Sequence, residues 1–194
     1  LRRSRGLGDV YKRQKLNIGD KIMQMVNPEF RNAVSKSHTA AHIVHASLRN
    51  ILGSHVAQAG SHVAPGKFRF DFSHTSKVSQ DELNTIFKDS NKNVFGDLEI
   101  DTRVMNIEKA KDEGALAFFG DKYDDDVRVV SIGDFSKELC GGTHVSNSHD
   151  VGLIVLTSES SIGSNLRRVE MLSGAEAYNF LTNAYSSYAS VSEL

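Results

Sequence analysis

Two short motifs, each with two side chains of the kinds that bind metals, constrain this chain more than any other feature. The first reads His38-Thr-Ala-Ala-His42 and the second Cys140-Gly-Gly-Thr-His144, and the whole middle of the sequence separates them. Imidazole and thiolate are borderline-soft ligands that suit zinc. A fold that brings the two motifs together would complete a four-ligand site, and we therefore predict bound Zn²⁺.

The first motif has the spacing of a helix with two different faces. We predict a helix over residues 35–52, with Ser35 or Ser37 as its N-cap and Gly53 just beyond its end. At about 100° per residue, its polar residues fall within an arc of roughly 60°, opposite its apolar ones. The polar side carries His38, His42, His45 and Arg49, and the apolar side carries Ile43, Val44, Leu48 and Ile51. The first two histidines, four residues apart, can therefore reach the same ion.

Neither motif alone is specific. Pairs of histidines at this spacing occur by chance, and a cysteine beside two glycines also fits a buried thiol next to a flexible loop. A zincin metalloprotease needs a glutamate directly after its first histidine, and this chain has Thr39 there. Peptide hydrolysis is thus disfavoured. Four protein ligands usually mark a structural zinc, so a catalytic and a structural role both remain open.

Composition describes an ordinary soluble chain. With 194 residues and 39% hydrophobic content, the chain can bury a core and form one or two domains. No apolar run approaches the roughly 20 residues that span a bilayer, and no stretch resembles a signal peptide. A lone cysteine cannot form an internal disulfide. We therefore expect a cytoplasmic protein without a membrane partner.

Charge is unevenly distributed along the chain. Residues 1–14 hold five Lys or Arg and one Asp, a net charge of +4. Since the whole chain has a net charge of −1, the remainder carries −5. The body is therefore not a general polyanion binder; we expect no DNA partner, and any contact with nucleic acid should use a local patch. Residues 1–14 show no apolar period, and we interpret them as an extraneous or disordered segment.

One predicted element precedes this helix and two follow it. Residues 15–34 contain a Gly19-Asp20 turn and a short apolar run over 22–26 that we interpret as a strand, the tail of a preceding β domain. Residues 67–72 alternate strictly, which predicts a strand with three phenylalanines on one face and charges on the other. Ser79 and Glu82 have the spacing of a capping box and predict a second helix.

The remaining elements are mostly strands. We predict strands over 98–107, 127–132, 152–157 and 166–172, a short helix over 108–113, and a final helix from Gly174 onward. Strands with interspersed helices, without regular βαβ alternation, indicate an α+β fold with a largely antiparallel sheet and helices packed around the zinc site. We assign the main domain to residues 35–173 and the start of a C-terminal linker helix to residues 174–194.

Seven segments together are specific for one family. In order, the chain reads HTAAH, QAGS, RFDF, GALAFFGDKY, VRVV, ELCGGTH and RRVE. This combination resembles the editing domain of alanyl-tRNA synthetases and its freestanding relatives, from Leu16 to about Leu181. The editing domain of threonyl-tRNA synthetases is similar in the histidine and Cys-x-x-x-His pairs, but the RFDF strand favours the alanine family.

The resemblance implies a zinc-containing hydrolase that removes serine or glycine wrongly attached to alanine tRNA. It implies zinc ligands at His38, His42, Cys140 and His144, and a pocket residue at Gln58. It also implies an internal fragment, with the ATP-dependent aminoacylation domain upstream and an oligomerisation domain downstream. The expected partners are the acceptor end of tRNA(Ala) and the rest of the synthetase in cis.

Further site residues are predicted by their positions. Thr39 and Ser61 can add to substrate recognition. Either Arg167 or Arg168 can meet phosphates, since strand alternation turns only one of them to the pocket side, although solvated surface arginines fit equally well.

The general base is left open. Asp71 and Glu138 are candidates, but Asp71 can instead pair with Arg69, and Glu138 can instead hold a ligand histidine. His45 shares the polar face of the first helix as a pocket wall or a ligand-supporting residue.

Two other functions compete with the enzyme. One is a non-catalytic, zinc-stabilised module that docks tRNA, which would bind tRNA without turnover. The other is a freestanding trans-editing protein, which is disfavoured because the sequence starts inside a β element and ends inside a helix.

Overall fold

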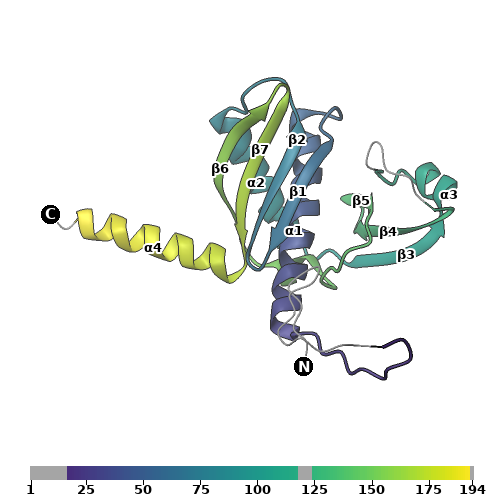
Figure 1. Ribbon diagram of the computed structural model, residues 1–194. Helices are drawn as coiled ribbons and strands as arrows, with labels where there is room; N and C mark the ends of the chain where they lie inside the picture. The colour runs from purple at the N-terminus through teal and green to yellow at the C-terminus, as the bar shows by residue number, and fades with distance from the viewer. Residues whose placement is uncertain (1–16, 118–123, 193–194) are drawn as a thin grey trace.

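The computed structural model describes residues 17–117 and 124–192 and contains two antiparallel sheets and several helices (Figure 1). The elements are, in order, α1 (Pro28–Leu52), β1 (Gln58–Ala64), β2 (Lys67–Ser73), α2 (Gln80–Val94), β3 (Ile100–Asn106), α3 (Ile107–Asp112), β4 (Asp126–Ile132), β5 (Ser136–Leu139), the 3-10 helix η1 (Ser148–Val151), β6 (Ile154–Gly163), β7 (Leu166–Ser173) and α4 (Ala175–Ser192).

The larger sheet has the strand order β1-β2-β7-β6, and all its pairs are antiparallel. Figure 1 shows α1 and α2 side by side on one face of this sheet, and the two helices contact each other. The smaller sheet, β3-β4-β5, stands beside α1 with its β5 edge toward the helix. This arrangement confirms the predicted α+β fold with antiparallel sheets.

The central strand β2 joins the helices to the sheet. Its alternation turns Phe68, Phe70 and Phe72 into the core, where they pack with Ile43 and Leu48 of α1. The opposite, charged face is only partly solvated because Asp71 is buried there. The prediction of a two-faced strand is confirmed, and burying these phenyl rings fixes α1 against the sheet.

Helix α1 begins seven residues earlier than predicted. Its N-cap is Asn27, whose side-chain oxygen accepts a hydrogen bond from the Phe30 N–H at 3.0 Å, and Pro28 occupies the first helical position. Proline suits this position because its missing N–H would have no partner there. The prediction of Ser35 or Ser37 as N-cap is therefore wrong, while the end at Leu52 before Gly53, with φ +116°, is confirmed.

The segment before α1 lies exposed and forms no strand. Asp20 N donates to Asn17 O at 3.1 Å, so the turn at Gly19-Asp20 is present. The predicted strand over 22–26 is wrong: among the described residues no neighbouring strand pairs with it, and α1 runs across the boundary placed between residues 34 and 35. Residues 1–14 lie outside the described residues.

Most other elements follow the sequence pattern. The capping box at Ser79 and Glu82 is formed, and β3, α3, β4 and β7 lie where strands and a helix were predicted. Strand β6 continues to Gly163, beyond its predicted end at residue 157. Two strands were not predicted: β1 has an irregular register between Gln58 and Gly60, and β5 is only four residues long.

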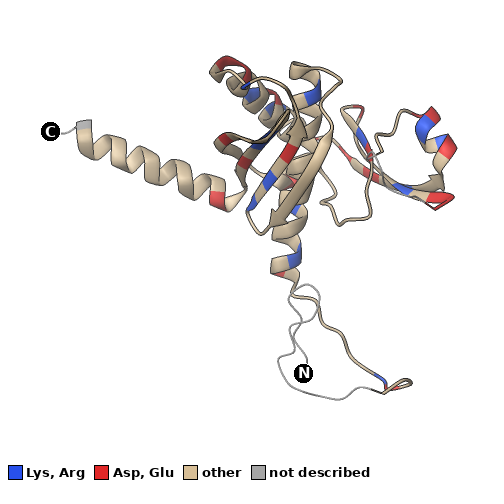
Figure 2. Ribbon diagram, turned by 45° about the horizontal axis from the view of Figure 1, so that its top comes forward, with Lys and Arg blue, Asp and Glu red and all other residues tan. Residues whose placement is uncertain are grey.

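Helix α4 extends away from the rest of the protein (Figure 1). Its first turn is anchored by the buried Ala177, whereas Tyr178, Tyr185 and Tyr188 are exposed. Figure 2 shows one acidic residue near its start and no other charge along the described helix. The prediction of a final helix is confirmed. Among the described residues, no helix combines the length and apolar character needed to cross a bilayer.

The packing of α1 on the sheet can be tested with two leucines in different helices. Leu48 of α1 is 0% exposed, whereas Leu181 of α4 is 42% exposed. We expect Leu48→Ala to lower the free energy of unfolding by about 2–5 kcal/mol because it leaves a cavity. Leu181→Ala should change it by no more than about 0.5 kcal/mol. Urea unfolding measures both, and equal losses would contradict this account of the core.

Candidate metal centre

Four side chains from the two sequence motifs meet beside α1. His38 and His42 project from the helix, and Cys140 and His144 lie in the loop after β5. Their possible ligand atoms all lie within 4.8 Å of one another, so this group can hold a metal ion. Cys140 Sγ lies 3.4 Å from His144 Nε2 and 3.6 Å from His38 Nε2. The structure therefore brings together the four residues predicted as ligands.

The loop that carries Cys140 is fixed by backbone contacts. Cys140 N donates to Arg128 O at 3.0 Å, and the Arg128 guanidinium donates to the carbonyls of Cys140, at 2.8 Å, and Gly142. A Cβ at Gly142 would lie 2.1 Å from His38 Cε1, so glycine is required for this approach of loop to helix. Sequence reasoning missed Arg128, although its place between the buried Val127 and Val129 marked it as the polar face of β4.

Thr39 supports His144. It is completely buried, and its Oγ1 lies 3.1 Å from His144 Nδ1 and accepts a hydrogen bond from Val145 N at 3.3 Å. A hydroxyl oxygen has two lone pairs, so it can accept from both groups and leave His144 Nε2 free for a metal. This position gives Thr39 a clear role in orienting a ligand, while its predicted contact with substrate stays a prediction.

Glu138 supports His42 from the other side. It is only 1% exposed, its Oε2 lies 3.0 Å from His42 Nδ1, and its Oε1 lies 3.0 Å from His45 Nδ1. Burial lowers the pKa of His42, but the negative charge of Glu138 and the contacts with Glu138 and Cys140 together outweigh burial and raise that pKa to about 10. Burial likewise opposes ionisation of Glu138, yet the two histidines hold its pKa below the usual range. Glu138 therefore stays ionised.

Cys140 is poised as a thiolate. Burial raises the pKa of its thiol, but hydrogen bonds from His144, His38 and His42 lower the pKa to about 3. Burial also lowers the pKa of His144, which favours its neutral form. One thiolate and three imidazoles form the donor set that zinc takes in tetrahedral sites, so these residues fit a zinc ion.

The predicted pocket residues of β1 lie next to each other. Gln58 Nε2 donates to Ser61 Oγ at 3.2 Å, at the irregular start of the strand. β1 packs on α1 and forms the sheet edge nearest the smaller sheet (Figure 1). The roles of Gln58 and Ser61 in substrate recognition stay predictions.

Both arginines of β7 are held in ion pairs on opposite faces of the sheet. The Arg168 guanidinium makes two contacts with Asp71, at 2.6 and 2.7 Å, and Arg167 Nε lies 2.6 Å from Glu159 Oε1. The predicted pairing of Asp71 with Arg69 is therefore wrong. Asp71 faces Arg168 across the β2–β7 register, so the side-chain partner comes from the neighbouring strand. Binding of phosphate by either arginine stays a prediction.

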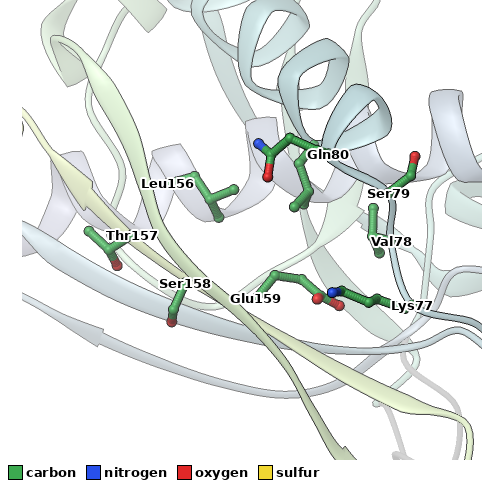
Figure 3. Close-up of a pocket in the computed structure, with 9 residues that line it drawn as sticks. Lys77, Val78, Ser79, Gln80, Leu156, Thr157, Ser158 and Glu159 are labelled. Carbon is green, nitrogen blue, oxygen red and sulfur yellow. The ribbon is translucent and has the colours of Figure 1, made fainter.

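A cavity of about 600 Å³ lies away from this centre, between the start of α2 and β6 (Figure 3). Its floor is apolar, formed by Val78, Leu83 and Leu156, and in Figure 3 Lys77 points toward Glu159 on one wall. β6 is the sheet edge opposite β1. The four metal-binding side chains are the only such group among the described residues, and they do not line this cavity.

The thiolate character of Cys140 gives a testable pH dependence. A thiol with a pKa near 3 has a constant thiolate fraction from pH 5 to 8, whereas an ordinary thiol gains about tenfold per pH unit over this range. In chelator-treated folded protein, the rate of iodoacetamide alkylation, followed by mass spectrometry, should therefore be nearly independent of pH. Urea-unfolded protein is the control. A folded-state rate that climbs tenfold per pH unit would contradict the hydrogen-bonded thiolate.

Comparisons with known proteins agree on one family. Residues 127–170 match the threonyl and alanyl tRNA synthetase second additional domain. The chain is 46% identical to an alanine–tRNA ligase of Streptomyces avermitilis over 93% of its length, and 42% identical to that of Clostridioides difficile over 89%. It spans about a fifth of the length of these relatives, 20% in both cases. The chain therefore belongs to the alanine–tRNA ligase family, of which it matches a segment that includes the second additional domain.

Proposed function

We propose that this chain is the editing part of an alanine–tRNA ligase and hydrolyses the ester of mischarged Ser-tRNA(Ala) or Gly-tRNA(Ala). The observation that carries this proposal is the convergence of two histidines, a thiolate and a third histidine within 4.8 Å, in a chain of this family. The chain spans 20% of the length of these relatives, and the reaction we propose for it is hydrolysis alone, without aminoacylation. The proposed partners are the acceptor end of tRNA(Ala) and the rest of the synthetase.

The discrimination problem explains why such a site would exist. An apolar pocket built for alanine gains only about 1–3 kcal/mol against glycine, which lacks one methyl group, and it rejects an added hydroxyl poorly. A separate polar pocket can favour serine strongly, because alanine would leave its hydrogen-bonding groups unpaired. We assign this recognition to Gln58, with Ser61 as its hydrogen-bonded neighbour.

The proposed cofactor is zinc, held by His38, His42, Cys140 and His144. When bound, zinc supplies positive charge that orients the polar groups of a substrate. The chain's own residues do the remaining work: Thr39 orients His144, and Arg128 holds the loop that presents Cys140. Neither candidate base is free, because Asp71 is bound by Arg168 and Glu138 by two histidines.

Hydrolysis of Ser-tRNA(Ala) by the 194-residue chain tests the proposal. We expect release of serine, loss of this activity with a chelator, and recovery on adding Zn²⁺. Gln58→Ala should lower the rate or the preference for serine over alanine by at least about tenfold, the cost of one lost hydrogen bond to a bound polar group.

The matched control is Gln80→Ala, in α2 beside the remote cavity, which should leave the rate unchanged. Binding of tRNA(Ala) without serine release would instead identify a non-catalytic docking module. Equal rates and equal discrimination for Gln58→Ala and the unaltered chain would overturn the role of Gln58.

A further inference from the structure

Glu138 lies between two histidines that leave α1 on the same face. His42 belongs to the metal-binding group, whereas His45 does not. Each oxygen of the carboxylate faces one Nδ1 atom at 3.0 Å, and Ser136 Oγ also donates to Oε1 at 3.2 Å. A carboxylate that is 1% exposed and contacts three polar groups is held in one orientation.

This contact decides which nitrogen of His42 can bind a metal. The contact with His45 has hydrogen-bond geometry, whereas the contact with His42 is a close ion pair in which Nδ1 makes no aligned hydrogen bond. An ionised carboxylate offers only lone pairs, so a proton on Nδ1 of each histidine is favoured at these distances. A metal bound at Nε2 would displace one proton of His42, and the proton that remains would sit on Nδ1, facing Glu138. His45 receives the same tautomer, but its ring packs against Phe70 with centroids 5.0 Å apart. The tautomer that Glu138 favours is therefore the same for both histidines. What separates the ligand His42 from His45 is the packing of the His45 ring against Phe70 in the core.

We propose that Glu138, clamped by His45 and Ser136, is a positioning residue of the metal centre that fixes the orientation and the tautomer of His42. This inference rests on the zinc centre of the proposed function. Glu138 acts through His42 and touches no substrate. His45 serves as the second donor that keeps the carboxylate in place, which accounts for a third histidine on the polar face of α1.

The test is the zinc dissociation constant of the full chain, measured by competition with a chromogenic chelator. The measurement is made under conditions where circular dichroism shows that the metal-free protein is folded. Glu138→Gln should weaken binding about 10–100-fold, because its amide offers one acceptor where the carboxylate offers two. The matched control is Glu159→Gln, whose side chain is 4% exposed and paired with Arg167 near the other sheet edge. This variant should bind zinc within about threefold of the unaltered chain, as remote buried groups do not contact the ligands.

A second pair of variants separates positioning from folding. Asparagine can place an N–H donor near the position of His45 Nδ1, whereas alanine cannot. His45→Asn should therefore keep zinc affinity within about threefold, and His45→Ala should weaken it by at least about tenfold. The visible spectrum of bound Co²⁺, which reports thiolate and imidazole coordination, should change with Glu138→Gln and not with Glu159→Gln.

Two outcomes would be decisive against these assignments. Equal zinc affinity and equal Co²⁺ spectra for Glu138→Gln and Glu159→Gln would overturn the positioning role and leave the zinc centre intact. Absence of zinc binding by the unaltered chain would overturn the zinc centre itself, and the positioning role with it.

Discussion

The contact between helix α1 and the Cys140 loop is the interaction on which the candidate site depends. It places polar side chains where water is largely excluded, so each needs a partner from the opposite element. Thr39 meets His144, and Glu138 of the smaller sheet meets His42 and His45. Helix and loop are therefore joined by complementary hydrogen-bonding groups and charges, in addition to the apolar packing of Val145 in the core cluster, and the same polar groups orient three imidazoles toward one thiolate.

The rigidity of this contact comes from the opposite side of the helix. Ile43, Val44 and Leu48 are fully buried, and the phenylalanines of β2 pack in the same core. A helix fixed on one face presents its other face in a constant orientation, which lets side chains far apart in sequence meet within a few ångströms. His45 touches both sides, since its ring packs on Phe70 while its Nδ1 contacts Glu138. The apolar core and the metal centre are thus physically continuous.

Periodicity predicted both faces of α1 and the inward phenylalanines of β2, because each depends only on residues within one element. The predicted start of α1 at Ser35 or Ser37 is wrong because Asn27 caps the helix and Pro28 directly after it fits a first helical position. The partner of Asp71 depends on which residue of β7 lies opposite, and no local pattern contains that register. Spacing suggested two metal-binding pairs, but their meeting required the tertiary fold. The role of Arg128 was missed for the same reason, because it depends on hydrogen bonds to backbone carbonyls of a loop outside its own strand.

Four protein ligands would restrict the chemistry that the proposed hydrolysis can use. If His38, His42, Cys140 and His144 all bound a zinc ion, they would leave no position on the ion for a water. Asp71 is bound through both oxygens to Arg168, and Glu138 is occupied by two histidines, so neither carboxylate can readily accept a proton from an attacking water. An aminoacyl ester is already activated relative to a peptide, however, and needs less assistance. Rate enhancement can then come from holding the ester against an ordered water and from hydrogen-bond donors at the developing oxyanion. In such a site the metal serves the geometry of the pocket, and discrimination rests on the polar side chains beside it.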